Sequence, residues 1–178
     1  MLVPNWLRDV LLTTAELELY RPRWSVTILD ETRRTLINRI GMREDQVDYT
    51  LTQMQGAFPE ALVTGYEAIA SSMPVNEKDR HVMAAALVGR AELIVTNNLR
   101  DFPEDLLAPL GLKACDADSF LMDLLARHRD RVHEALQFMA DNTGKAGKPE
   151  LSLYDIVKNI AATAENFAAA ALYLFDIT

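Results

Sequence analysis

The 178-residue sequence predicts an α/β fold in which a doubly wound parallel sheet is flanked by helices. Segments with helical periodicity alternate with short apolar runs between residues 61 and 115, a pattern typical of parallel strands joined by helices. After Asp116 only helical periodicity continues. The sequence therefore divides into an α/β domain over residues 1–115 and an all-helical extension over residues 116–178.

The individual elements follow from apolar spacing and from turn residues. Three helices are predicted first, at 5–19, 25–40 and 44–55, with Ser25 as the N-cap of the second and Gly41 at its end. In the second helix, Leu29, Leu36 and Ile40 are expected to face the core while Glu31 faces the edge of the sheet. The elements expected further along the chain are strands 61–66, 92–96 and 112–115, a brief helix after Tyr66, helix 79–90, and the later helices 117–127, 130–141, 152–163 and 165–174, with a turn-rich linker at 141–152.

Composition limits the class of protein. No apolar run approaches the roughly 20 residues that span a bilayer, and the N-terminus lacks the pattern of a secretory signal, so a cytoplasmic protein is expected. Cys115 is the single cysteine, which excludes an internal disulfide, and we interpret it as a small buried side chain rather than a nucleophile. His81, His128 and His133 do not have the spacing of a zinc site.

Charge is unevenly distributed along the chain. The net charge of −8 weakly disfavours nucleic acid, but residues 21–43 hold six arginines against Asp30 and Glu31. This basic segment could face a phosphate backbone. A solvated helix face explains the same arginines equally well when each is taken singly.

Polar residues follow the predicted strand 92–96 in the stretch IVTNNLRDFP. Thr96, Asn98 and Asp101 would lie at the carboxyl edge of a parallel sheet, where α/β proteins bind ligands. Glu31 on helix 25–40 and Asp79 at the start of helix 79–90 are two further acidic candidates. Converging carboxylates would hold Mg²⁺ or Mn²⁺, and such an ion can activate water and stabilise charge on a phosphodiester oxygen.

Each acidic residue also has a structural explanation. Asp79 can cap its helix, where negative charge is favoured. Glu31 can pair with Arg34 or Thr35 one helical turn later. Asp101 can serve as a turn residue before Phe102 and Pro103.

Several longer segments together resemble PIN-domain proteins of the VapC toxin type. They are SVTILDETRRTL (25–36), FPEALVTGY (58–66), DRHVMAAALVGRAELIVTNNLRDFP (79–103) and DADSFLMDLL (116–125), and the similarity is greatest to a VapC subgroup with an extra C-terminal helical region. The resemblance implies a ribonuclease dependent on Mg²⁺ or Mn²⁺ and held inactive by a cognate antitoxin. It implies that Glu31 matches the second acidic residue of the family and Asp79 the third. Asp101 or Asn98 then occupies the fourth region, and Thr96 supplies the hydroxyl at the strand end.

The sequence departs from the family at its beginning. Family members start with a central strand that carries the first acidic residue, an Asp followed by a hydrophobic segment and Pro. Met1-Leu2-Val3-Pro4 matches only the end of that segment, so this first strand and its Asp are expected to be missing. Loss of the carboxylate would weaken the metal site, and loss of the strand would leave backbone groups of its neighbours unpaired.

The sequence therefore predicts a metal-dependent endoribonuclease toxin. Glu31, Asp79 and Asp101 would be its metal ligands, with Asn98 and Thr96 in supporting roles, and Arg33, Arg34 and Arg100 would contact RNA. The expected partners are an RNA substrate, a cognate antitoxin and a second copy of the chain in a homodimer. The alternative is a catalytically impaired PIN remnant that binds an antitoxin or RNA.

Overall fold

The computed structural model describes residues 2, 3, 5–145 and 149–178. By contacts, the chain separates into two compact units. The first, Arg21–Cys115, is here called the α/β unit. The second combines Met1–Tyr20 with Asp116–Thr178 and is called the helical unit. Met1 and Pro4, which belong to the stretch that matches the end of the family's hydrophobic segment and Pro, lie outside the described residues.

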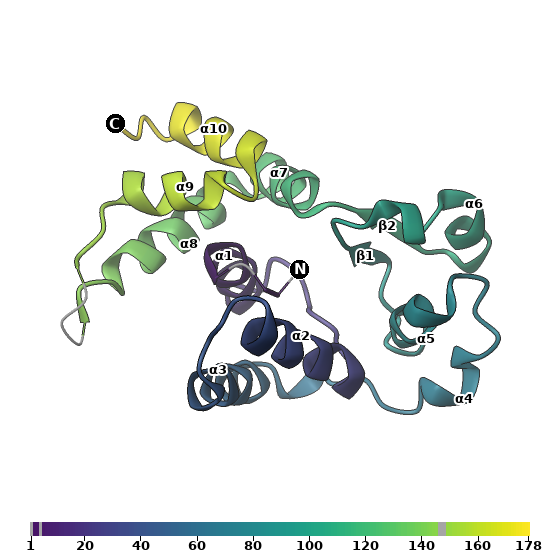
Figure 1. Ribbon diagram of the computed structural model, residues 1–178. Coiled ribbons are helices and arrows are strands. Elements are labelled where there is room, and N and C mark those ends of the chain that lie inside the picture. The colour runs from purple at the N-terminus through teal and green to yellow at the C-terminus, as the bar shows by residue number, and fades with distance from the viewer. Residues whose placement is uncertain (1, 4, 146–148) are drawn as a thin grey trace. The chain divides into compact units, whose positions relative to one another are not determined.

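The α/β unit contains a small parallel sheet together with short helices (Figure 1). Strand β1 (Leu93–Val95) pairs with β2 (Lys113–Cys115) in parallel, with Ile94 opposite Ala114. The helices of the unit are α2 (Val26–Asn38), α3 (Glu44–Ala57), α4 (Glu67–Ala70), α5 (Arg80–Val88) and α6 (Glu104–Leu107). Single 3₁₀ turns lie at Pro59–Ala61, Glu77–Asp79, Leu99–Asp101 and Ala108–Leu110.

The predicted strand at 61–66 does not form. Pro59 starts a 3₁₀ turn that ends at Ala61, and Gly65 has a left-handed backbone with φ of 78°, so only a short extended stretch remains between them. Leu62 in this stretch makes an isolated parallel bridge to Trp24. In the described part of the chain the sheet therefore has two strands rather than the larger doubly wound arrangement that we expected.

Helix α2 begins as predicted but ends earlier. The Ser25 hydroxyl accepts a hydrogen bond of 3.2 Å from the Ile28 amide, which confirms the N-cap. Leu29 and Leu36 are buried, but the expectation for Ile40 was wrong, because this side chain is 55% exposed. The helix ends at Asn38, so Ile40 no longer follows the helical periodicity that would turn it inward.

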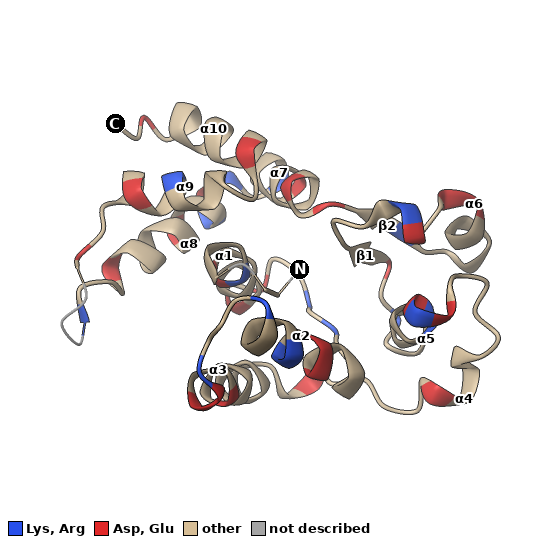
Figure 2. Ribbon diagram, viewed as in Figure 1, with Lys and Arg blue, Asp and Glu red and all other residues tan. Residues whose placement is uncertain are grey.

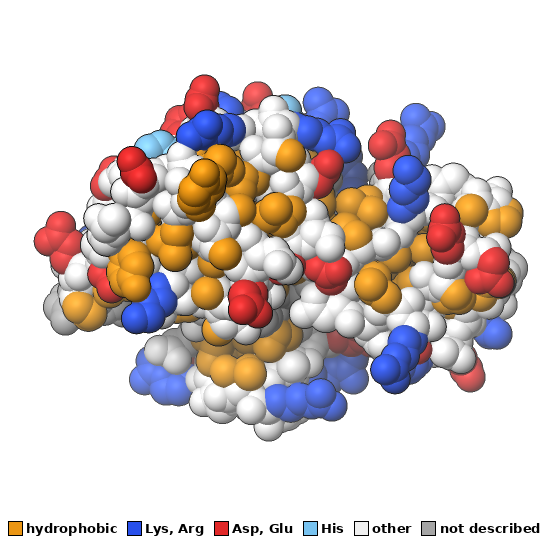
Figure 3. Space-filling view, turned by 90° about the horizontal axis from the view of Figure 1, so that it is seen from above, with side chains coloured by type: hydrophobic (Ala, Val, Ile, Leu, Met, Phe, Trp, Pro, Cys, Tyr) orange, Lys and Arg blue, Asp and Glu red, His pale blue; other side chains and the backbone are white. Residues whose placement is uncertain are grey.

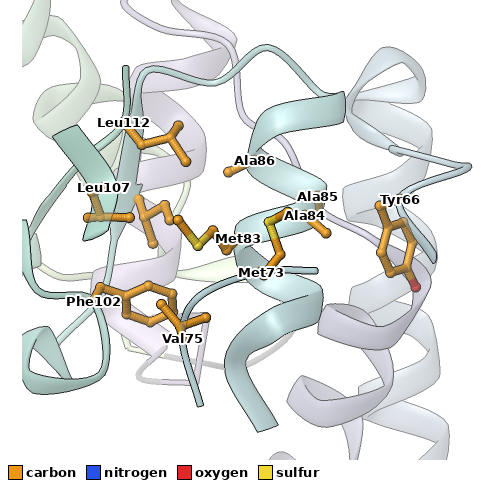
Figure 4. Close-up of a cluster of buried hydrophobic side chains, with 11 residues drawn as sticks. Tyr66, Met73, Val75, Met83, Ala84, Ala85, Ala86, Phe102, Leu107 and Leu112 are labelled. Carbon is orange, nitrogen blue, oxygen red and sulfur yellow. The ribbon is translucent and has the colours of Figure 1, made fainter. Parts of the chain in front are cut away.

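The core of the α/β unit surrounds α5 (Figure 4). Met83, Ala84, Ala85 and Ala86 of this helix are buried. Small alanines let neighbouring chain approach the helix closely. The remaining buried residues of the cluster are Tyr66, Met73, Val75, Ile94, Phe102, Leu107 and Leu112. Phe102 anchors the turn that follows β1, so the polar residues just before it are held against a packed core.

The helical unit contains α1 (Asn5–Glu16), α7 (Ala117–Arg127), α8 (Arg129–Asp141), α9 (Leu153–Ala161) and α10 (Glu165–Leu174). Helix α10 packs against α7 and α9, and α1 packs against α8 and α9. The apolar residues that recur along the predicted helices are buried as expected: Phe120, Leu124, Leu125, Val132 and Leu136. None of the described helices combines the length and the apolar character needed to cross a bilayer.

The linker expected at 141–152 ends at Ser152, which is the N-cap of α9. Ser152 and Asp155 form a capping box in which each side chain bonds the backbone amide of the other. Residues 146–148 of the linker lie outside the described part of the chain.

Candidate functional site

Asp79 and Asp101 lie together in the α/β unit, although 21 residues separate them in sequence. Each ends a 3₁₀ turn, one just before α5 and the other just after β1. The Lys78 ammonium links them, with Nζ 2.6 Å from Asp101 Oδ2 and 3.6 Å from Asp79 Oδ2. The structure thus brings two of the three predicted metal ligands to one place.

Asp79 occupies the N-cap position of α5, but its side chain makes no capping hydrogen bond. Its side chain is only 18% exposed, and the buried Oδ2 atom has no hydrogen-bond partner among the described residues. Burial raises the pKa of this carboxyl, and the nearby charge of Asp101 raises it further. Capping therefore does not explain why the Asp79 carboxylate is buried.

Asp101 is the better stabilised carboxylate of the pair. Its hydrogen bond with Lys78 is the main cause that holds the pKa of Asp101 below its ordinary value. The Asn98 side-chain amide donates to Oδ2, and the Asn76 amide donates to Oδ1 over 3.4 Å. A residue that only forms a turn does not need three side-chain donors on its carboxylate, so the turn alone does not explain Asp101.

Thr96 supports this site through hydrogen bonds with the backbone of Asn98 and Cys115. Its Oγ1 accepts a 3.2 Å hydrogen bond from the Asn98 amide, which sets the start of the turn that carries Asn98 and Asp101. The Thr96 amide donates over 2.8 Å to the Cys115 carbonyl at the end of β2. Thr96 therefore ties the polar turn to the sheet, and Asn98 contacts the carboxylate.

Glu31 approaches the same region from α2 but pairs with a histidine. Glu31 Oε2 lies 3.3 Å from His81 Nε2, and His81 is two residues after Asp79 in the first turn of α5. The orientation does not form a hydrogen bond, so the buried Nε2 has no hydrogen-bond partner among the described residues. Arg34 does not take the pairing role with Glu31 that sequence spacing allowed.

The described residues do not contain a preassembled group of three His, Cys, Asp or Glu side chains that could hold one metal ion. Asp79 and Asp101 alone still suit a divalent cation, because Mg²⁺ commonly binds through one or two carboxylates and keeps several waters. Asp79 Oδ2 lies 3.6 Å from the Lys78 ammonium but has no hydrogen-bond partner among the described residues, so it is also the kind of atom that a divalent cation would satisfy. Asp79 and Asp101 are therefore the residues that fit a metal in this structure.

The three candidate RNA-binding arginines differ in their surroundings. Arg33 is bound to Asp48 of α3 through two hydrogen bonds of 2.7 and 3.3 Å. Among the described residues Arg34 donates only to the Asp30 carbonyl, at 3.3 Å, and both Arg34 and Arg100 are exposed. Along α2 two acidic residues, Asp30 and Glu31, are followed by two arginines, Arg33 and Arg34. Figure 2 shows red and blue segments on this helix.

Sequence reasoning missed two residues of this site. Lys78 directly precedes Asp79 in sequence. This position could have identified it, because a lysine beside an expected metal ligand can supply a positive charge that competes with the metal ion. His81 was considered only for zinc spacing, and its approach to Glu31 depends on how α2 packs beside α5.

The chain belongs to the VapC family of PIN-domain toxins, as the resemblance of its motifs implied. Over 143 residues it is 33% identical to the protein named "Putative ribonuclease VapC50" from Mycobacterium tuberculosis (strain ATCC 25618 / H37Rv). The matched region covers 80% of this chain and 81% of that protein. No family model matches the chain. No solved structure matches it either.

Proposed function

We propose that the chain is an endoribonuclease toxin that depends on Mg²⁺ or Mn²⁺ and is neutralised in the cytoplasm by a cognate antitoxin. The single observation that carries the metal dependence is the Asp79–Asp101 pair, in which a buried carboxylate oxygen has no hydrogen-bond partner among the described residues. Membership of the VapC family supports RNA as the substrate. Homodimerisation remains a prediction.

In this proposal each residue of the site has a defined role. Asp79 and Asp101 hold the divalent ion, and Asn98 keeps the Asp101 carboxylate oriented through its amide. When bound, the ion polarises a phosphodiester oxygen and offsets the charge that develops there during hydrolysis. Thr96 fixes the turn that supports these ligands.

Glu31 is the third acidic residue of the proposal. Its side chain is 48% exposed and faces His81, so it can receive a proton from water or bind a water ligand of the ion at the border of the site. The His81 ring is only 15% exposed, which limits how far it can move. Glu31 therefore adds negative charge beside the Asp79–Asp101 pair without needing to contact the ion itself.

The alternative function is a catalytically impaired PIN protein that binds RNA or an antitoxin. The observation that favours it is the Lys78 ammonium, which already neutralises part of the carboxylate pair. A second is that the described residues hold no preassembled group of three ligands. Both functions are compatible with RNA binding, and only the first predicts metal-dependent cleavage.

RNA cleavage by the purified chain, with any antitoxin removed, separates the two functions. The nuclease proposal expects cleavage that appears with Mn²⁺ or Mg²⁺, stops in EDTA, and is lost in Asp79→Asn and Asp101→Asn. Asp105→Asn is the matched control, since this exposed residue of α6 carries the same charge. RNA binding without cleavage at any metal concentration would favour the alternative.

A further inference from the structure

A shallow, open hollow of about 380 Å³ lies along α2 beside Glu31. Its lining residues are Glu31, Arg34, Thr35, Asn38 and Arg39. These positions are separated by three, four, seven and eight residues from Glu31, so they form one stripe on a single helix face. Eight residues at about 1.5 Å each give this stripe a length of about 12 Å.

The stripe presents hydrogen-bond donors. Arg34 and Arg39 supply two guanidinium groups, Asn38 supplies an amide, and Thr35 a hydroxyl that here donates to the Glu31 carbonyl. Neither arginine makes an ion pair with the residues that the structure describes, and both are exposed. Arg33 on the neighbouring face is instead bound to Asp48 and lies 3.6 Å from Glu44.

Unpaired arginines in a hollow suit phosphate groups, because a guanidinium binds phosphate through paired hydrogen bonds and cannot lose its charge. A protein partner is less well matched. Protein interfaces depend on apolar or aromatic anchors in their centres, and the described residues of this hollow are all polar. The local positive charge also contrasts with the net charge of −8 of the whole chain. On the face shown in Figure 3, acidic, basic and apolar side chains are interspersed rather than sorted into one broad patch.

We propose that Arg34, Asn38 and Arg39 bind successive phosphates of single-stranded RNA and lead the strand along α2 to Glu31. This inference rests on the proposed function, because it assigns the path by which the substrate reaches the Asp79–Asp101 pair. The Glu31–His81 contact connects the end of the stripe to the first turn of α5, directly after Asp79. Arg33 is paired with Asp48 of α3 and is not part of this proposed path.

The test measures RNA binding without cleavage. A fluorescein-labelled oligouridine of 12 nucleotides is titrated with the chain in EDTA at several NaCl concentrations, and binding is followed by fluorescence anisotropy. Arg34→Gln/Arg39→Gln should weaken binding at low salt by at least about fivefold and reduce the salt slope by about 1.4, which is about 0.7 for each lost phosphate contact. Circular dichroism confirms that the variant is folded, as exposed positions should allow.

The matched control is Arg21→Gln/Arg43→Gln, which removes two exposed charges from the same basic segment outside the hollow. Its binding and salt slope should stay close to those of the original chain. An equal loss in the control would overturn the proposal, because binding would then follow overall charge rather than the stripe. Unchanged RNA binding in Arg34→Gln/Arg39→Gln would also overturn it, and loss of antitoxin binding in the same variant would reassign the hollow to a protein partner.

Failure of this inference differs from failure of the proposed function. If the original chain binds oligouridine through the two arginines but never cleaves RNA with Mn²⁺, the nuclease proposal fails and the RNA path stands. If cleavage with Mn²⁺ proceeds with the same KM in Arg34→Gln/Arg39→Gln, the RNA path is wrong and the nuclease proposal stands.

Discussion

Lys78 is the residue through which the two carboxylates share one positive charge. Its hydrogen bond with Asp101 is the main cause that raises the pKa of the Lys78 ammonium, and the charge of Asp79 adds to it. The side chain is 66% exposed, so it can swing away at modest cost when a stronger cation arrives. A divalent ion must nevertheless compete with this ammonium for the carboxylate pair.

Replacing Lys78 should therefore strengthen metal binding. Lys78→Met removes the competing charge while keeping most of the side-chain volume, and the Kd for Mn²⁺ should fall by about tenfold, which corresponds to about 1.4 kcal/mol. Isothermal titration calorimetry measures this directly. Arg100→Met is the control. Arg100 directly precedes Asp101 in sequence, as Lys78 precedes Asp79, but among the described residues it forms no ion pair with either carboxylate. A similar gain in both variants would show that only the overall charge matters.

At the residue scale the sequence predicted part of the site. Asp101 is a candidate because a strand followed by a polar turn and Phe102-Pro103 indicates a sheet edge, and Asp79 is a candidate because it starts a helix. Their common contact with Lys78 and the pairing of Glu31 with His81 depend on tertiary packing between distant segments. Local periodicity does not contain that information.

Close packing at the end of α5 sets the position of this helix. A Cβ atom on Gly89 would lie 2.7 Å from Val63 Cγ2 and 2.9 Å from the Ala85 carbonyl oxygen, whereas nothing lies within 4 Å of a Cβ on Gly56 in α3. Gly89→Ala should lower the free energy of unfolding by about 1–3 kcal/mol. Gly56→Ala should raise it by about 0.5–1 kcal/mol.

Urea unfolding followed by circular dichroism compares the two glycine variants under the same conditions. Gly56 lies inside α3, where alanine is favoured by helix propensity, whereas Gly89 is the C-cap residue of α5 and is the one whose added Cβ would meet neighbouring atoms. Equal effects of the two substitutions would contradict the close approach of α5 to residue 63.

Helix α10 receives its cap from another helix. Asp118 of α7 accepts hydrogen bonds from the Asn166 and Phe167 amides, at 3.0 and 2.7 Å, and from the Asn166 side chain at 2.7 Å. The residue at the N-cap position, Ala164, has no side chain that could do so.

Asp118→Ala should therefore lower the free energy of unfolding by about 1–2 kcal/mol, as loss of a cap does. Chemical denaturation measures the change. Asp123→Ala on the same helix is the control, since it removes only an exposed pair with Arg127 and should cost no more than about 0.5 kcal/mol. If the two variants lose the same stability, Asp118 is not the cap.

At the element scale, most helices were predictable because their apolar spacing and caps are local features. Ser25 and Ser152 illustrate this, since each N-cap lies where the sequence signals a helix start. The strand predicted at 61–66 failed because Pro59 and Gly65 leave room for only a bridge at Leu62. Apolar residues alone did not distinguish a strand from a short buried connection.

At the scale of the whole molecule, α1 is grouped with the C-terminal helices. Leu7 and Val10 of α1 are fully buried, and Arg131 of α8 donates a 2.9 Å hydrogen bond to the Leu17 carbonyl. The sequence suggested the boundary after residue 115, but this grouping joins residues more than a hundred positions apart. Such a contact cannot be found from local patterns.

Because α1, α8 and α10 belong to one unit, they should lose protection from amide hydrogen exchange together. In Asp118→Ala, amide hydrogen exchange should accelerate in α1 and α8 as well as in α10, because these helices pack in one unit, while α5 should change little. Mass spectrometry of peptides from each helix measures the rates. Acceleration in α10 and α5 with α1 unchanged would contradict the grouping.

The most direct test of the account is the binding of Mn²⁺ to the α/β unit within the full chain, followed by electron paramagnetic resonance. One Mn²⁺ should bind per chain and be lost in both Asp79→Asn and Asp101→Asn, because each substitution removes one of the two carboxylates that Lys78 links among the described residues. Asp105→Asn should bind as the original chain does. Undiminished Mn²⁺ binding in Asp79→Asn and Asp101→Asn would contradict the assignment of this pair as the metal site.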